Sequence, residues 1–209
     1  LRYFIMTPIE YSPKFIDSAD DIFGILWNEL AWVRSNLPRR EYYWNALGLP
    51  YTYGKGNNAK TYQSQYLHPI IAELRDYLLE KTGTNFNVCF LNGYENSRDH
   101  LGWHADDSPE MDNDSAIAII SLGAEREIWF RPNDLHVESI LILEYGNGIM
   151  DIDLLHQRRE LHKSPYKLLL GNGSLCLMLP GMQQTHQHRI PKCDRDCGPR
   201  ISLTFRVYK

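Results

Sequence analysis

The sequence has no long apolar run, few cysteines and no large excess of one charge. No stretch of its 209 residues approaches the roughly eighteen consecutive apolar residues of a membrane helix. The first residues, LRYFIMTPIEYSPKF, lack the charged, apolar and small-residue regions of a signal peptide. We therefore expect a soluble protein with no membrane partner, located in the cytoplasm, or in the nucleus of a eukaryotic cell.

Four cysteines are too few for a disulfide scaffold in a chain of this length, which favours a reducing compartment. The formal net charge of -4 argues against a protein that coats nucleic acid non-specifically. A locally basic face could still contact a few phosphates. Arg39 with Arg40, and Lys192 with Arg195, are candidates for such a face, although ordinary solvated charges explain each pair equally well. No linker or repeat divides the chain, so we expect one domain over residues 1–209, acting as a monomer.

Two amphipathic helices are predicted in the first half of the chain. The segment from Ser18 to Val33 places apolar residues three or four apart behind a capping serine and an acidic first turn. A second helix is predicted from Pro69, with Gly83 placed to end it. The apolar residues expected to face inward are Ile22, Leu26, Leu30 and Val33 in the first helix, and Ile70, Ile71, Leu74, Leu78 and Leu79 in the second.

After Gly83 the pattern changes to short runs with β-branched or aromatic character, which predict strands. Gly-Asn-Gly sequences at 146–148 and 171–173 are typical of tight hairpin turns. Helices followed by many short strands indicate a mainly β protein with flanking helices (α+β), arranged as an antiparallel sandwich or jelly roll. The predicted strands cover 86–94, 116–122, 127–131, 139–144, 175–179 and 200–207.

A His-x-Asp pair, His104 and Asp106, follows Trp103 in the sequence GWHADD. On an extended strand these two side chains point to the same side, because side chains alternate with a period of two. Both could therefore bind one metal ion. A motif this short also arises by chance, so the hypothesis requires a third ligand.

The segment THQHRIPKCDRDC holds the other dense group of candidate ligands. His188 could join His104 and Asp106 in the set of two histidines and one carboxylate that holds iron(II) with open positions for oxygen and a cosubstrate. A second interpretation is a structural zinc site built from this segment alone, by His186, His188, Cys193 and Cys197, although their spacing is irregular. A third is that these histidines are surface residues that bind no metal.

The last predicted strand, RISLTFRV, has one apolar face and one polar, basic face. One face carries Ile201, Leu203, Phe205 and Val207, and the other carries Arg200, Ser202, Thr204 and Arg206. A guanidinium is rarely buried without an anionic partner. The two arginines are about 20 Å apart at roughly 3.3 Å per residue, a distance that two inward-leaning side chains and a short dicarboxylate could fill. On an edge strand both arginines could instead face water.

Taken in order, NGY, WHADD, a histidine twelve residues before an arginine, and PRISLTFR resemble the AlkB family of iron(II)- and 2-oxoglutarate-dependent dioxygenases, which demethylate alkylated nucleobases. The similarity runs from about Pro38 to the C-terminus and is more specific to the branch that repairs duplex DNA. It implies a double-stranded β-helix, the jelly roll of these enzymes. It also implies Fe(II), 2-oxoglutarate as cosubstrate and O2, with alkylated DNA, or else RNA, as the partner.

The resemblance assigns iron to His104, Asp106 and His188. It prefers His188 to His186 because the spacing to Arg200 matches the family's pattern. It assigns the cosubstrate to Asn92, Tyr94, Arg200, Ser202 and Arg206. Asn92 and Tyr94 also share one face of their predicted strand. The family usually has Asn where this chain has Ser202, whose hydroxyl can supply only part of the same hydrogen bonding.

An enzyme that acts on a base in a duplex must extrude that base and stack it against aromatic or apolar groups. By resemblance, the segment 36–65 is expected to form a nucleotide-recognition lid in which Tyr51 and Tyr53 contact the base. Asp107 could accept a hydrogen bond from an exocyclic amine of the base. The two tyrosines would also suit an ordinary hairpin. The segment 145–168 is longer than expected.

The implied reaction couples decarboxylation of 2-oxoglutarate to hydroxylation of a methyl group on a base nitrogen, which then leaves as formaldehyde. Within the same enzyme class, RNA or a protein side chain could be the substrate. From a different class, the chain could be a non-catalytic nucleic-acid-binding module with structural zinc.

Overall fold

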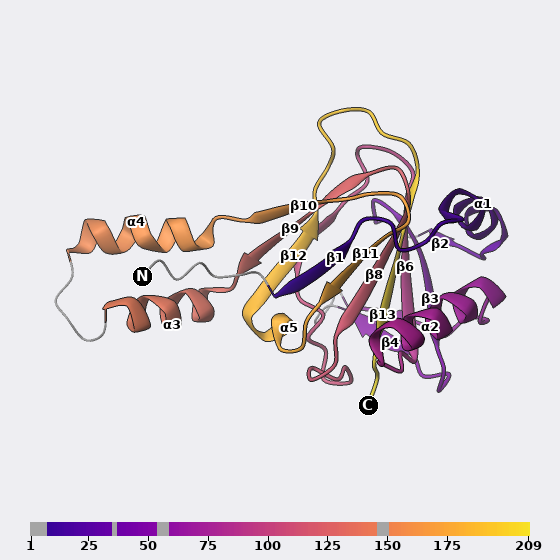
Figure 1. Cartoon of the computed structure of the whole chain (residues 1–209), viewed down its shortest axis with the longest axis horizontal. Coiled ribbons are helices and arrows are strands. Elements are labelled where there is room, and N and C mark those ends of the chain that lie inside the picture. Colours follow the sequence, from indigo (N-terminus) through magenta and orange to yellow (C-terminus); the bar gives the residue numbers. More distant parts are fainter. Residues whose placement is uncertain (1–7, 35–36, 54–58, 146–150) are drawn as a thin grey trace.

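The short apolar segments of the second half of the chain pair antiparallel in two sheets that form the body of the protein (Figure 1). The computed structural model describes residues 8–34, 37–53, 59–145 and 151–209. In order across the sheet, the seven strands of the larger sheet are β1 (Ile9–Ser12), β11 (Ser174–Met178), β8 (Ile117–Gly123), β13 (Arg200–Arg206), β6 (Val88–Tyr94), β3 (Arg40–Asn45) and β2 (Val33–Arg34). The four strands of the smaller sheet are β10 (Tyr166–Leu170), β9 (Arg126–Pro132), β12 (His186–Ile190) and β7 (Leu101–His104).

Apolar side chains from both sheets meet in one buried cluster, so the sheets face each other. Ile119 on β8 and Met178 on β11 come from the larger sheet, and Ile128 on β9 and Ile190 on β12 come from the smaller one. This arrangement is a jelly roll, as the sequence predicted. The strands predicted at 86–94, 116–122, 127–131, 175–179 and 200–207 are confirmed.

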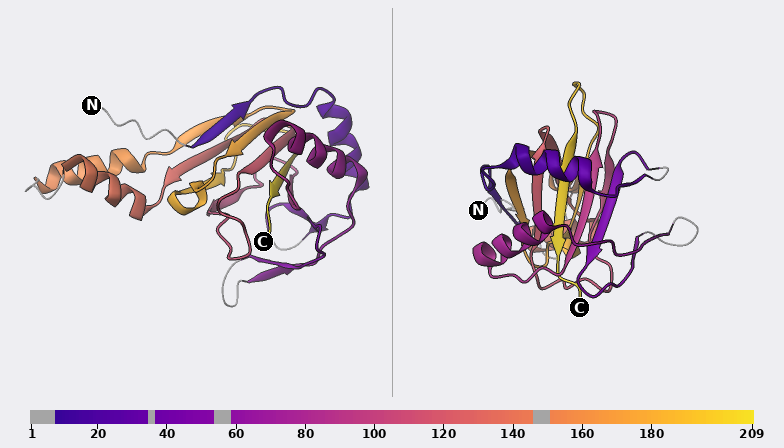
Figure 2. Two further views of the ribbon diagram at one scale, coloured as in Figure 1. Left: turned by 60° about the horizontal axis from the view of Figure 1, so that its bottom comes forward. Right: turned by 90° about the vertical axis from the view of Figure 1, so that its right-hand side faces the viewer.

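Helices α1 (Ala19–Glu29) and α2 (Pro69–Thr82) cover the outer face of the larger sheet, as the right-hand view of Figure 2 shows. Leu26 of α1 and Leu78 of α2 are fully buried in a cluster with the outward side chains of β13 and β6. Gly83 ends α2 in the left-handed conformation at φ 71°, which confirms its predicted role.

Some details of the helix predictions are wrong. The first helix stops at Glu29, because Leu30 already adopts an extended conformation, and Val33 lies exposed in β2. The Ser18 side chain makes no capping hydrogen bond. Leu79 is exposed, because it lies beside the buried stripe of α2 and outside it.

The predicted strand at 139–144 is instead part of a helix, α3 (Asp134–Tyr145). The apolar run ILIL fits a strand or a buried helix equally well, and the start signal lies upstream, where the Asn133 side chain accepts the backbone N–H of His136. A further helix, α4 (Ile152–Lys163), follows antiparallel to α3, and the pair extends away from the sheets (Figure 1). Of the extra length noted at 145–168, residues 152–163 form α4 and residues 166–168 begin β10. Within the described residues, no helix has both the length and the apolar character to cross a membrane.

The segment 36–65, expected to form a lid over the surface, does not do so in its first half. β3 is a buried strand that pairs with β6, because its aromatic residues Tyr42, Tyr43 and Trp44 fill both faces of the sheet. The remainder forms a two-stranded hairpin of β4 (Tyr51–Tyr53) and β5 (Lys60–Tyr62), with 54–58 outside the described residues.

One Gly-Asn-Gly turn, at 146–148, lies outside the described residues. The other, at 171–173, joins β10 to β11, which belong to different sheets, so it is not a hairpin within one sheet. Gly173 has φ 75°, and a Cβ there would lie 2.5 Å from the carbonyl oxygen of Ile16. Only glycine allows the chain to pass from one sheet to the other so close to the N-terminal segment.

Candidate metal and cosubstrate site

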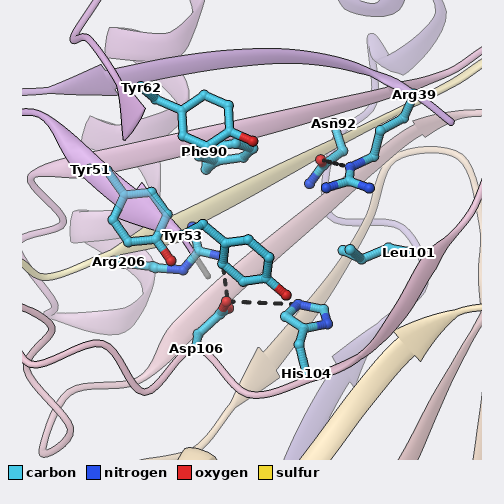
Figure 3. Close-up of a pocket in the computed structure, with 10 residues that line it drawn as sticks. All are labelled: Arg39, Tyr51, Tyr53, Tyr62, Phe90, Asn92, Leu101, His104, Asp106 and Arg206. Carbon is cyan, nitrogen blue, oxygen red and sulfur yellow. Dashed lines mark hydrogen bonds and ion pairs between the residues drawn. The ribbon is translucent and has the colours of Figure 1, made fainter. Parts of the chain in front are cut away.

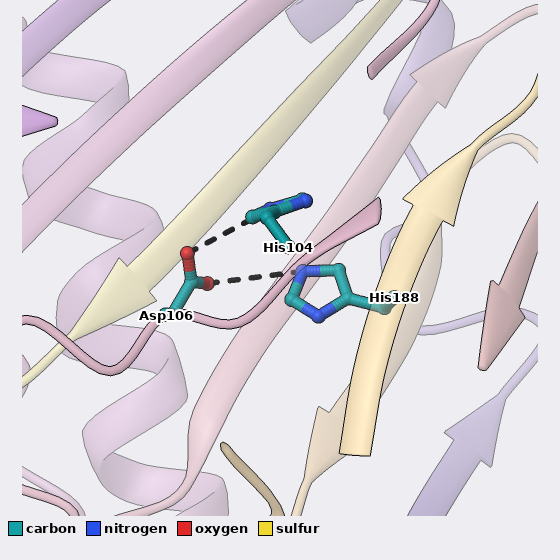
Figure 4. Close-up of side chains that lie close together, drawn as sticks. All are labelled: His104, Asp106 and His188. Carbon is teal, nitrogen blue, oxygen red and sulfur yellow. Dashed lines mark ion pairs between the residues drawn. The ribbon is translucent and has the colours of Figure 1, made fainter. Parts of the chain in front are cut away.

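Three side chains that can bind a metal lie close together at strands β7 and β12 of the smaller sheet (Figure 4). His104 ends β7, Asp106 follows it, and β12 brings His188 directly opposite His104 in the strand register. All three are buried or nearly so, and their ligand atoms lie within 4.8 Å of one another. Among the described parts of the chain, no other group of three or more histidines, cysteines or acids is close enough to hold a metal ion.

Both histidines present a neutral nitrogen lone pair to this site. The backbone carbonyl of Gly102 lies 2.9 Å from His104 Nδ1, which favours a proton on Nδ1 and leaves Nε2 free to bind a metal. Burial lowers the pKa of His104. Burial, together with the neighbouring His104, lowers the pKa of His188 to about 3. Neither ring therefore has to lose a proton at neutral pH before it binds a cation.

Asp106 is held ionised and in position by its neighbours. Its Oδ2 accepts a hydrogen bond from Arg206 Nη2 at 2.7 Å, and its backbone N–H donates to the Gln183 side chain at 2.9 Å. Burial alone would raise the pKa of this carboxyl. The Arg206 guanidinium and the two imidazoles outweigh burial and keep the pKa of Asp106 well below its usual range.

Trp103, which directly precedes the His-x-Asp pair, points away from the site. The guanidinium groups of Arg131 and Arg189 both contact its ring, with their Cζ atoms 4.4 and 4.8 Å from the ring centroid. These cation–π contacts on the outer face of the smaller sheet tie the short edge strand β7 to β9 and β12. Trp103 thus stabilises the strand that carries His104, from the face opposite the metal ligands.

The residues of the alternative zinc site do not gather around one point. His186 packs against the ring of His136 on α3 at 5.3 Å between centroids, on a part of β12 that does not reach the metal site. Cys193 and Cys197 are free, half-buried thiols in the loop that follows β12. The structure therefore brings together the first ligand set that the sequence suggested and not the second.

β13 is a central strand between β8 and β6, so the possibility that its arginines face water is wrong. The Arg200 side chain is 0% exposed, and its Nε donates to Ser121 Oγ at 2.8 Å. Its Nη1 and Nη2 have no hydrogen-bond partner among the described residues. The guanidinium carbon lies 5.2 Å from the ring centroid of Tyr94, whose buried hydroxyl also lacks a partner within that part of the chain. Burial lowers the pKa of Arg200 to about 10, which leaves it cationic at neutral pH.

A pocket with about 330 Å³ of empty space, part of it open to solvent, leads to the metal ligands (Figure 3). Six of its lining residues were singled out from the sequence: Tyr51, Tyr53, Asn92, His104, Asp106 and Arg206. Four were not singled out as site residues: Arg39, Tyr62, Phe90 and Leu101. The remaining predicted residues lie outside the lining, with His188, Tyr94, Arg200 and Ser202 buried behind it and Asp107 exposed beyond Asp106.

The β4–β5 hairpin supplies the aromatic wall of this pocket. Tyr53 meets the His104 ring edge-on, with 6.3 Å between ring centroids. Tyr51 is buried against Tyr62, and burial raises the pKa of Tyr51 to about 12. A flat ligand that entered between the hairpin and the metal ligands would therefore meet Tyr53 and His104 first.

Arg39 and Tyr62 could not be identified from local sequence patterns. Arg39 reaches the pocket because β3 pairs with β6, which puts the Arg39 guanidinium beside Asn92. Tyr62 reaches it because β5 folds back over β3, where its hydroxyl donates to Glu41. The only sequence signal was the pair of basic residues Arg39 and Arg40, which looked like a surface patch.

A sequence model of the 2OG-Fe(II) oxygenase superfamily matches residues 31–206. Alpha-ketoglutarate-dependent dioxygenase alkB homolog 3 of Bos taurus is 31% identical over 210 residues, which cover 93% of this chain and 64% of that protein. DNA oxidative demethylase ALKBH2 of Homo sapiens is 30% identical, with 90% of this chain and 68% of that protein covered. The chain thus spans 64% of the length of the first of these relatives.

Two solved structures share the fold. OsALKBH1 superposes with a TM-score of 0.59 at 14% identity, covering 98% of this chain and 100% of that chain. A prolyl-4-hydroxylase of Pseudomonas putida superposes with a TM-score of 0.52 at 11% identity, covering 98% of this chain and 94% of that chain. At such low identities the likeness concerns the fold alone.

Proposed function

We propose that this chain, which belongs to the AlkB family of 2OG-Fe(II) oxygenases, removes methyl groups oxidatively from N-alkylated bases in DNA. One observation carries the proposal: β13 places Arg206 beside the carboxylate of a buried set of two neutral histidines and one carboxylate, and the same strand carries the fully buried Arg200, two of whose guanidinium nitrogens have no partner among the described residues. The first feature suits iron(II), and the second suits the carboxylate of a cosubstrate.

The donor set fits the metal and cosubstrate that the family name specifies. Two imidazoles and one carboxylate are the ligands that non-haem iron(II) oxygenases use, and they leave coordination positions open. Arg200 and Tyr94 offer buried donors without partners to one end of a short diacid. Arg206 has its Nε and Nη1 free beside Asp106, on the metal side of the same strand. Asn92 and Ser202 lie opposite each other in the strand register between these two arginines.

Bound iron(II), with 2-oxoglutarate and O2, would supply the oxidation, in which succinate is released and a methyl group on the base nitrogen is hydroxylated. The chain's own residues would bind and orient the metal, the cosubstrate and the base. His104, Asp106 and His188 would hold the metal, and Arg206 keeps Asp106 ionised and correctly turned. The β4–β5 hairpin would hold the extruded base and exclude water above the metal ligands.

Support for a DNA base as substrate comes from the two relatives, of whose length 64% and 68% is matched here, and from the aromatic pocket wall. Flat aromatic rings suit a stacked base better than a protein side chain. Asp107, exposed beyond Asp106, is available to contact the edge of such a base. RNA carries the same bases, so the experiment below includes it.

The test is an anaerobic iron(II) titration followed by turnover on DNA and RNA oligonucleotides that each carry one N-methylated base. We expect succinate and formaldehyde in equal amounts, with DNA preferred. The variants His188→Ala and His186→Ala form a matched pair on the same strand, and only His188→Ala should lose iron and turnover. A wild-type protein that takes up zinc in place of iron and releases no succinate would rule the proposal out.

A further inference from the structure

A fully buried carboxylate lies beneath the β4–β5 hairpin, outside the metal site. Glu41, on β3, is 0% exposed. It accepts a hydrogen bond from Tyr62 Oη at 3.0 Å and forms ion pairs with Arg39, at 3.0 Å, and with Lys60. Two of these partners belong to the hairpin, and the third belongs to the pocket wall. Glu41 therefore joins the hairpin to the larger sheet through charged and polar contacts.

Arg39 carries this connection to Asn92. Its Nε donates to Asn92 Oδ1 at 2.7 Å, and its side chain is nearly buried. A guanidinium has donors only, so it can pair with the oxygen of the Asn92 amide and not with the nitrogen. The Asn92 NH2 group is consequently turned toward the pocket, as Figure 3 shows. There it can donate to an oxygen of a bound carboxylate or keto acid.

A purely structural role explains this network poorly. Burying a carboxylate and a guanidinium costs several kcal/mol per ion in desolvation, and apolar residues of similar size usually serve stability as well or better. The network also lies on the pocket wall, which Arg39, Tyr62 and Asn92 all line. Its placement suggests a function in binding.

We propose that Glu41 is a positioning residue with two effects, an inference that rests on the proposed function. Through Arg39 it fixes the Asn92 amide so that its NH2 group faces the cosubstrate. Through Tyr62 and Lys60 it holds the base-binding hairpin over the metal ligands. Cosubstrate and base binding therefore depend on one buried carboxylate that touches neither ligand.

The first experiment measures 2-oxoglutarate affinity by calorimetry, anaerobically with Mn(II) in place of iron and without nucleic acid. Glu41→Gln keeps the side-chain size but removes the charge that holds Arg39, and we expect about tenfold weaker binding of 2-oxoglutarate. If Glu41 acts through Asn92, the double variant with Asn92→Ala should bind no more weakly than Asn92→Ala alone. Glu95→Gln is the matched control, because Glu95 also pairs with two arginines, Arg34 and Arg40, but neither arginine lines the pocket as Arg39 does.

The second experiment measures the affinity of the same variants for an oligonucleotide with one N-methylated base. Glu41→Gln should weaken this binding several-fold because the hairpin loses its anchor, whereas Asn92→Ala should not. If Glu41→Gln does not fold, Arg39→Lys replaces it for the cosubstrate measurement. A lysine retains the charge beside Glu41 but cannot bridge Glu41 and Asn92 with a planar fork, so the same loss of 2-oxoglutarate affinity is expected.

Three outcomes would overturn the inference: an unchanged 2-oxoglutarate affinity in Glu41→Gln, losses that add fully in the double variant, or an equal loss in Glu95→Gln. Each of these can occur while the wild-type protein binds 2-oxoglutarate and releases succinate. Failure of the wild-type protein itself to bind 2-oxoglutarate would instead refute the proposed function.

Discussion

Replacing Arg200 with methionine should affect folding stability and cosubstrate binding very differently. Arg200 is fully buried and, among the described residues, donates one hydrogen bond, to Ser121. The variant Arg200→Met loses that bond, at about 1–3 kcal/mol, and a cation–π contact with Tyr94 of about 0.5–2 kcal/mol. It also removes a buried charge whose desolvation costs several kcal/mol. These contributions nearly cancel, so the free energy of unfolding without ligands should change by less than about 2 kcal/mol.

Cosubstrate affinity should fall steeply in the same variant. A carboxylate bound to both free nitrogens of Arg200 would make two charge-assisted hydrogen bonds, each of about 1.5–3 kcal/mol. Losing both should weaken 2-oxoglutarate binding by roughly two to four orders of magnitude. Arg200→Lys retains the charge but loses the planar fork, so a smaller loss of about 1–3 kcal/mol is expected.

The assay combines urea denaturation without ligands with calorimetric titration of 2-oxoglutarate. Arg126 provides the matched control, because it is also fully buried and its guanidinium carbon lies 5.4 Å from the centroid of the same Tyr94 ring. Its donors, however, are satisfied by the backbone carbonyls of Asn96, Asp99 and Pro191. Arg126→Met should therefore destabilise the ligand-free protein by several kcal/mol. Strong destabilisation by Arg200→Met, with 2-oxoglutarate affinity retained, would refute the reasoning.

Three further predictions concern the loop after β12, the pocket wall and acid stability. The double variant Cys193→Ser, Cys197→Ser should keep its iron and its turnover, and a stoichiometric zinc lost with these thiols would contradict this. Tyr53→Ala should weaken binding of a methylated-base oligonucleotide by about 1–3 kcal/mol, whereas Tyr53→Phe should retain most of it; equal losses would exclude stacking. Burial, with a smaller effect of His136, lowers the pKa of His186 to about 4 from 6.5, so the free energy of unfolding should fall as the pH drops from about 6.5 to 4. Urea titrations of His186→Phe should show a shallower dependence, and an unchanged one would place the sensitivity elsewhere.

Local patterns predicted five of the strands, β6, β8, β9, β11 and β13, and both helices that cover the larger sheet. Alternation on the last strand separated its core residues from its arginines, and the structure buries both faces because the strand lies at the centre of the sheet. The segment 139–144 was assigned wrongly because a short apolar run fits a strand or a helix, and tertiary packing decides between them. The strand β3 was missed because aromatic residues bury both of its faces and hide the alternation.

The site was predictable to the extent that its residues are close in sequence or resemble a family motif. His104 and Asp106 form such a pair, and the resemblance alone distinguished His188 from His186. The network of Arg39 and Glu41 could not be predicted. It depends on the register in which Glu41 lies opposite Asn92, across strands about fifty residues apart, and no local pattern specifies that register.

From the sequence, Arg200 and Arg206 had equivalent predicted roles at the two ends of a short dicarboxylate, but the structure gives them different surroundings. Within the described parts of the chain, two Arg200 nitrogens have no partner and no acid pairs with its guanidinium, so this charge is available to a ligand. One nitrogen of Arg206 already donates to Asp106, and the positive charge of this guanidinium helps to keep that carboxylate ionised. The larger sheet therefore contributes to the metal site indirectly, through this ion pair, while the smaller sheet supplies both histidines. A cosubstrate that binds between the arginines would lie along β13 of the larger sheet, and its binding and that of the metal should be linked through Arg206 and Asp106.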